Sequence, residues 1–163
     1  MKPVYILPNG KPLGASDFCK YFEKKVLYTV RKFSMSREVR VKKDNSVNSN
    51  VLRSLYVKFG FMNNNSKTVA LADSADDLST MLLESWFSNK EPHFKPVTKK
   101  EIRPFFLMTD QEISIYAAIK HITGKVKKKS SARAMLDSME KPHPEVKRAI
   151  VQAYLQLLEI RKK

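Results

Sequence analysis

The first third of the chain combines a turn signal with one long amphipathic stretch. Residues 4–13 contain an apolar run, the turn sequence Pro-Asn-Gly-Lys and a short return, and this order predicts a β-hairpin. From Phe18 to Phe33 apolar residues recur every three or four positions, which predicts a helix with one buried stripe. We expect Ser16 or Asp17 to cap that helix, because a short oxygen-bearing side chain accepts the first free N–H groups.

The middle of the chain alternates between strand-like and helix-like periods. Short apolar segments with alternation indicate strands, and longer segments with a period near 3.6 indicate helices. In chain order the patterns predict a strand at 38–42, a polar loop at 44–49, a helix at 51–59, a connector at 63–66, a strand at 68–71 and a helix capped by Asp73 or Ser74.

The last part is expected to be helical after a long connector. Residues 89–104 contain three prolines and many charges, which is typical of a linker or an extended excursion. Thr109 and Glu112 have the spacing of a capping box, so a helix should begin there. A basic connector at 125–129 and a short helix follow. The final helix should start after Pro144 and bury the apolar residues Val146, Ile150, Ala153, Leu157 and Ile160.

Composition narrows the function classes. The 163 residues are 42% hydrophobic and 29% charged, which is enough apolar material for a packed core. Thirty-one Lys and Arg against 16 Asp and Glu give a net charge of +15, and such an excess favours a polyanionic partner such as nucleic acid. The alternative is that the positive charge only keeps the protein soluble.

Several kinds of site and location are not expected. One cysteine, Cys19, allows neither an internal disulfide nor a thiolate zinc cluster, and the three histidines are too far apart to form a metal set. No catalytic residue, metal or cofactor is therefore expected. Met1 is followed by Lys2-Pro3 without an apolar run, and no segment approaches the roughly 18 apolar residues of a membrane span. A cytoplasmic protein without membrane contact is expected.

Two basic clusters are candidate nucleic-acid contacts. Lysine suits phosphate as a point charge, so these clusters predict contact with the backbone of a structured RNA rather than reading of its bases. The alternative for any lysine run is a solvated connector. The first cluster is Arg37, Arg40, Lys42 and Lys43, and the second is Lys125, Lys127, Lys128, Lys129 and Arg133.

Four stretches together resemble the tRNA 2-thiolation family of PP-loop ATP pyrophosphatases, of the TtuA and cytosolic thiouridylase type. The stretches are residues 12–33 with FCKYFEKKVLYTVRKF, residues 39–52, VALADSADDL at 69–78 and IRPFFLMTDQEISIY at 102–116, with 135–158 resembling the closing element. The resemblance covers about two-thirds of the chain. It implies an α/β fold: a helix-rich remnant of the PP-loop (adenine nucleotide alpha hydrolase-like) fold, with a degenerate N-terminal hairpin and a helical C-terminal extension.

The resemblance also implies three regions, with a degenerate zinc-ribbon hairpin and helix at 1–35, a reduced α/β core at 36–104 and helices at 105–163. The chain skips family strands and helices between Phe61 and Ser66. We therefore expect an unpaired strand edge, which favours self-association or a protein partner.

The sequence departs from the family where the family does its chemistry. In family members the phosphate loop has the sequence Ser-Gly-Gly-x-Asp-Ser, in which glycines let backbone N–H groups surround pyrophosphate. The matching positions here are Asp44, Asn45, Ser46, Val47, Asn48 and Ser49, a vestigial PP-loop without glycine. Asp76 and Asp77 keep the acidic pair that helps place Mg²⁺–ATP in an active relative. The alternative is that they serve the first turn of a helix, where negative charge is favourable.

The zinc ligands and catalytic cysteines of the family have no counterpart either, since Leu13-Gly14-Ala15-Ser16-Asp17-Phe18 replaces the ligand segment. The sequence therefore predicts a non-catalytic RNA-binding or scaffolding member that binds tRNA or an active PP-loop subunit. One alternative is a general basic RNA- or ribosome-associated protein. Another is an active tRNA sulfurtransferase with a rearranged ATP site.

Overall fold

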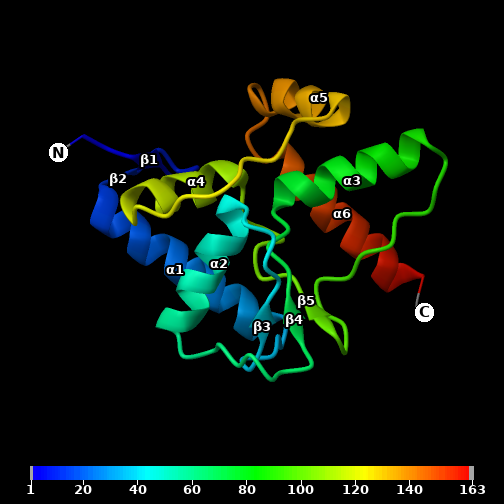
Figure 1. Cartoon of the computed structure of the whole chain (residues 1–163). Coiled ribbons are helices and arrows are strands. Elements are labelled where there is room, and N and C mark those ends of the chain that lie inside the picture. Colours follow the sequence, from blue (N-terminus) through cyan, green and yellow to red (C-terminus); the bar gives the residue numbers. More distant parts are fainter. Residues whose placement is uncertain (1, 162–163) are drawn as a thin grey trace.

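The main sheet of the molecule consists of three parallel strands joined by helical crossovers. The computed structural model describes residues 2–161 (Figure 1). Two consecutive βαβ units make this an α/β fold, which confirms the predicted class. The sheet order is β3-β4-β5, and its elements are β3 (Arg40–Val41), α2 (Val47–Lys58), β4 (Val69–Ala70), α3 (Ala75–Phe87) and β5 (Glu101–Ile102).

The remaining elements precede and follow this unit. Helix α4 packs against α1 and α2, while α6 packs against α3 and α5, so the helices form two groups beside the sheet (Figure 1). The elements are the antiparallel hairpin β1 (Tyr5–Ile6) and β2 (Pro12–Leu13), then α1 (Ala15–Lys32), α4 (Asp110–Ile119), α5 (Ser131–Glu140) and α6 (Val146–Ile160). The predicted hairpin is confirmed, and Gly10 supplies the positive φ of 82° in its turn.

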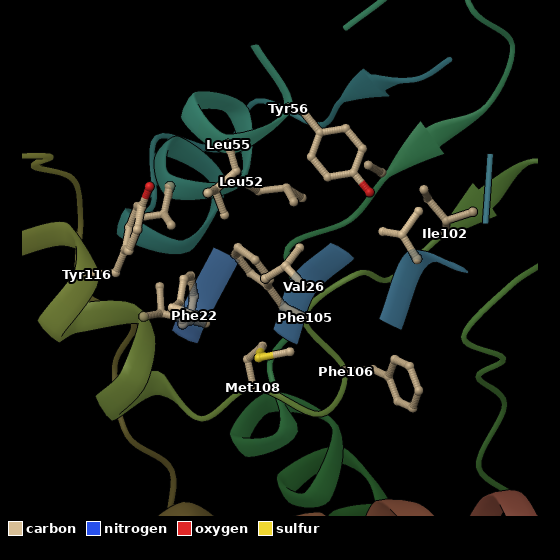
Figure 2. Close-up of a cluster of buried hydrophobic side chains, with 14 of the residues drawn as sticks. Phe22, Val26, Leu52, Leu55, Tyr56, Ile102, Phe105, Phe106, Met108 and Tyr116 are labelled. Atoms are coloured by element: carbon tan, nitrogen blue, oxygen red, sulfur yellow. The ribbon is translucent and has the colours of Figure 1, made fainter. Parts of the chain in front are cut away.

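One hydrophobic core joins the three predicted regions. Phe22 of α1 stacks on Tyr116 of α4 with ring centroids 4.9 Å apart, and Phe105 lies against the same ring of Phe22 (Figure 2). Cys19 also lies on the buried side of α1, with 7% of its surface exposed. Residues from Leu13 to Tyr154 belong to this core, so the helical C-terminal region packs as part of the same body. The division into three regions stays a prediction.

The three-stranded sheet buries only one of its faces. Val41, Ala70 and Ile102 point into the core and expose 7% or less of their surface. Their neighbours Arg40 and Lys42 are exposed and point to the opposite side. Parallel sheets are usually covered on both faces, so this alternation marks an incomplete layer.

The chain covers the outer edges of its own sheet. On the β3 side, Val39 N–H donates to Phe61 and Asn63 N–H donates to Val39. On the β5 side, Arg103 N–H donates to Pro96, and Thr98 N–H donates to Glu101. The expectation of an unpaired strand edge is wrong at these positions, because two irregular segments supply the missing hydrogen bonds.

Several predicted boundaries are also wrong, each for a physical reason. Helix α1 is capped by Gly14 without a side-chain bond, since it starts directly after the hairpin and places Ser16 and Asp17 inside its first turn. Helix α2 begins at Val47, four residues earlier than predicted, because Ser46 caps it and accepts from Ser49 N–H. Strand β5 lies inside the predicted linker.

The buried face of α6 matches the predicted one only in part, because Val146 and Ile150 are half-buried and Ile150 packs against the core. Ala153 is exposed, and Leu157 and Ile160 expose 54% and 68% of their surface. The buried residues are instead Val151, Tyr154 and Lys147. Lys147 is not part of the predicted stripe, because a stripe of apolar residues does not include a charged side chain. By contrast, the capping box of α4, from Thr109 to Glu112, is confirmed, and so is the cap of α3 at Ser74. Asp77 extends the cap of α3 into a capping box as well.

Candidate functional site

The candidate site lies where the carboxyl ends of the parallel strands meet three helix N-termini. Ligands of open α/β sheets bind at this edge. A cavity of about 540 Å³ occupies it, bounded by the first turns of α2, α3 and α4 and by the segment from Lys125 to Arg133. The vestigial PP-loop and the acidic pair, which are far apart in sequence, come together here with the second basic cluster.

The vestigial PP-loop uses its own side chains to satisfy the start of α2. The Asp44 carboxylate accepts from Ser46 N–H at 2.9 Å, and Ser46 Oγ accepts from Ser49 N–H at 3.1 Å. Burial raises the pKa of Asp44, but the hydrogen bonds from Ser46 and the charge of Lys127 outweigh burial and lower it overall. A carboxylate thus holds donors that a phosphate loop would offer to its ligand.

A second segment covers the same helix start from outside. Val47 N–H donates to the carbonyl of Lys125 at 3.3 Å, and Lys125 N–H donates to Asn45 at 2.8 Å. Between these bonds Gly124 lies so close that a Cβ there would be 2.6 Å from Val47 N. Segment 123–125 therefore occupies the approach to the first turn of α2, and only glycine fits at its centre.

The acidic pair divides into two roles. Asp77 completes the capping box of α3 and also pairs with Lys127 at 2.7 Å. Burial and the neighbouring Asp110 raise the pKa of Asp77, although Lys127 opposes the shift. Asp76 is 2% exposed and accepts from Asp110 N–H at 2.7 Å, so it links the starts of α3 and α4. These bonds agree with the alternative role of the pair, in which both carboxylates stabilise the starts of helices.

The charge of Asp76 is matched by cations from the C-terminal helices. Lys147 Nζ lies 2.6 Å from Asp76 and also binds Asp137 and Glu140. Arg133 binds Asp76, Asp110 and Asp137 at 2.8 to 3.2 Å. Burial opposes the charged form of Lys147, but its carboxylate partners raise its pKa overall, and they raise that of Arg133 in the same way. We call Asp76, Asp110, Arg133, Asp137, Glu140 and Lys147 the ion network.

The ion network also bears on metal binding. Oxygens of Asp76, Asp137 and Glu140 lie within 4.8 Å of one another, a spacing that could hold a metal ion. Lys147 Nζ already bonds to all three carboxylates. The protein's own ammonium group therefore supplies the positive charge that this acidic group requires.

A second buried carboxylate, that of Glu112, belongs to one of the stretches that carry the family resemblance. Glu112, with no exposed surface, binds Lys25 of α1 and Arg148 of α6, both at 2.8 Å. Burial raises the pKa of Glu112, but the charges of Lys25 and Arg148 outweigh it and lower the pKa overall. Nearby, Tyr116 O–H donates to Glu23 at 2.8 Å. The Glu and Tyr of IRPFFLMTDQEISIY thus join helices and lie outside the cavity lining.

The two basic clusters have different surroundings. Lys127, Lys129 and Arg133 of the second cluster are bound to Asp77, Asp137 and the ion network. In the first cluster, Arg37 lies over the ring of Phe61 at 5.9 Å. Among residues 2–161, no ion pair involves Arg37, Arg40, Lys42 or Lys43. Arg40, Lys42 and Lys43 of this first cluster line another hollow, on the sheet face.

Sequence reasoning missed Asp110, Asp137, Glu140 and Lys147. Asp110 carried a usable signal, because it follows the capping Thr109 at the start of a helix, where acidic residues are favourable. Lys147 stands four residues before Val151 and seven before Tyr154, which places it on the same helix face as these two residues. A lysine in line with a buried stripe indicates a buried carboxylate partner.

These features define an α/β fold in which the vestigial loop and the acidic pair lie at the carboxyl edge of the parallel sheet. The structure is similar to that of the U34-tRNA thiolase NcsA from Methanococcus maripaludis, determined with its 4Fe–4S cluster, with a TM-score of 0.75. The match covers 96% of this chain and 84% of that chain at 15% identity, so it confirms the predicted fold. No protein-family model matches the sequence. No curated protein matches it either.

The cluster of this structural neighbour does not fit the residues of the present chain. Iron–sulfur clusters of this type are held by several cysteine thiolates. The chain has one cysteine, and Cys19 lies in the core rather than at the cavity. A separate observation concerns membranes: among the described residues, no helix is both long and apolar enough to span one.

Proposed function

We propose that this protein is a non-catalytic relative of the tRNA thiolases that binds tRNA or another structured RNA in the cytoplasm. An active PP-loop subunit is its expected protein partner. The proposed loss of catalysis rests on one observation above all, namely that the chain partly fills its own nucleotide site. The Asp44 carboxylate accepts from Ser46 N–H and the carbonyl of Lys125 accepts from Val47 N–H, while Lys147 and Arg133 supply the cations beside Asp76.

Two observations support RNA as the ligand. The net charge of +15 creates a field that concentrates polyanions, and the structural neighbour is by its name an enzyme of U34 in tRNA. The exposed cations of the first cluster have no carboxylate partner among the described residues, so binding phosphate would break no ion pair there. The residues proposed for this contact include lysines, which suit phosphate rather than base edges.

Two titrations of the full chain test this function. In calorimetry with Mg²⁺–ATP we expect no binding heat, because the N–H groups of Ser46, Val47 and Ser49 are already bonded within the chain. In fluorescence anisotropy with a labelled tRNA transcript we expect binding that weakens with salt. The slope of log affinity against log salt should be roughly −3 to −6, which corresponds to about four to eight phosphate contacts.

The controls separate the alternatives. A hairpin RNA of equal length that binds as tightly as tRNA would favour a general basic RNA-binding protein over a tRNA-specific one. Micromolar affinity for ATP would contradict the filled-site argument and favour an active enzyme with a rearranged site. Absence of tRNA binding even at about 50 mM salt would contradict the RNA-binding role, since electrostatic contacts are strongest there.

A further inference from the structure

The uncovered face of the parallel sheet is the largest departure of this molecule from a complete α/β layer. Register places Arg40, Val69 and Glu101 side by side on this face, and Lys42 and Leu71 follow in the next row. A hollow of about 610 Å³ lies over them. We call this surface the open sheet face, and its residues are Arg40, Lys42, Lys43, Asn64, Val69, Leu71 and Glu101.

The charge of this face points to an anionic occupant. Arg40, Lys42 and Lys43 are exposed and belong to no ion pair among the described residues. The one carboxylate of the face, Glu101, lies 3.4 Å from Arg103, which also binds Asp73 at 3.0 Å. Three cations without a partner therefore surround a hollow whose floor is formed by half-buried Val69 and Leu71.

We propose that the open sheet face binds the phosphate backbone of RNA, an inference that rests on the proposed function. Guanidinium and ammonium groups on successive outward positions of β3 are spaced along an extended line, as consecutive phosphates of a strand are. An RNA backbone brings charge that the cations need, whereas an apolar protein surface would bury three unpaired cations at a high cost.

The same reasoning ranks the face above the connector from Lys125 to Lys129. Lys127 and Lys129 each lie within 2.7 Å of a carboxylate, so a phosphate must compete with Asp77 and Asp137 for them. Phosphates meeting Arg40 and Lys42 displace only water and counterions. The open sheet face is therefore the primary contact, and the connector contributes through Lys125 and Lys128.

Charge reversal with a matched control tests this surface. The variant R40E/K42E is compared with K20E/K24E, which makes the same change on exposed residues of α1. The probe is fluorescein-labelled tRNA transcript at about 0.1 M salt. R40E/K42E should lose on the order of tenfold in affinity, and its salt slope should become less negative by about 1.5 as two contacts are lost. K20E/K24E should change affinity less than about threefold. Should R40E/K42E fold poorly, R40Q/K42Q serves instead with a smaller expected loss.

Each of the other possible results shows which part of the proposal is wrong. Equal losses in R40E/K42E and K20E/K24E would show that binding follows net charge, and would overturn the face while keeping RNA binding. Full binding by R40E/K42E with loss in K127A/K128A/K129A would move the contact to the connector. If the wild-type protein formed a dimer and R40E/K42E were a monomer, the open sheet face would bind a second copy of the chain instead of RNA. Wild-type protein that binds no tRNA would overturn the proposed function itself.

Discussion

The edge of the sheet and its open face carry similar basic side chains in opposite settings. At the edge, Arg133 and Lys147 are nearly buried and contact several carboxylates. On the face, Arg40 and Lys42 are exposed without an ion-pair partner among residues 2–161. Paired cations hold two helices against the site, while unpaired cations are free to meet a ligand. Positive charge therefore serves stability in one region and is available for binding in the other.

Removing a paired cation should have the largest effect on stability. In Lys147→Met the buried Asp76 keeps only Arg133 as a cationic partner, and Asp137 and Glu140 lose a shared ammonium group. We expect the free energy of unfolding to fall by about 3–5 kcal/mol, as when one partner of a buried ion pair is removed. Urea denaturation followed by circular dichroism measures this change.

The control for that variant is Lys141→Met, at an exposed position between α5 and α6. It should alter stability by no more than about 0.5 kcal/mol. If the two methionine variants were equally stable, the ion network would not hold the C-terminal helices on the site.

A smaller effect is expected from Asp137→Asn, and it should depend on pH. Burial raises the pKa of Asp137, but its bonds to Lys129, Lys147 and Arg133 outweigh burial and hold the pKa well below its usual range. The carboxylate therefore stabilises the fold above its unfolded pKa of about 4, and this contribution disappears as the pH falls through the lower folded value. The variant should lose about 1.5–3 kcal/mol at pH 7.

Thermal melting of both proteins between pH 2 and 7 checks the sign. The gap between the two curves should narrow below about pH 4, because the unfolded wild-type chain then takes up a proton on Asp137 that the folded chain does not. A deficit in Asp137→Asn that stayed constant down to pH 2 would contradict the ion-pair origin. Glu38→Gln, at an exposed position before β3, provides the control and should change stability by less than about 0.5 kcal/mol at pH 7.

The smallest effect is expected on the open sheet face. Replacing Arg40 and Lys42 together with alanine removes two exposed charges without an ion-pair partner, so stability should change by less than about 0.5 kcal/mol. At low salt the variant should be slightly more stable than the wild type, because the net charge of +15 repels itself. Denaturation at two salt concentrations measures this difference. A loss above 1 kcal/mol would make these cations structural and weaken the contrast with the edge.

Local patterns predicted most of the helices. The stripe of α1 and the capping residues Ser74 and Thr109 depend on neighbouring residues alone, so the sequence is sufficient to find them. Strand β5 was missed because two residues among charges and prolines carry no periodic signal. The cover over α2 was missed because Gly124 and Val47 are distant in sequence, and their contact is set by packing.

The ion network shows the same limit for charged residues. A lysine run looks alike in sequence whether it is solvated or bonded to carboxylates. Lys127 and Lys128 are neighbours, yet only Lys127 has a carboxylate partner within the part of the chain that the structure describes. Which cation meets an acidic group depends on the folding of α5 and α6 over the strand ends, and periodicity does not encode that arrangement.

The position of Cys19 gives the molecule a built-in reporter of its own opening. It carries the only thiol group of the sequence, and it faces the core from α1. Burial shields this thiol from reagents and also raises its pKa, so in the native state little of the reactive thiolate forms. A thiol reagent modifies the chain only as fast as the core around α1 opens. The labelling rate of unaltered protein therefore reports how readily the core around α1 opens, with or without RNA.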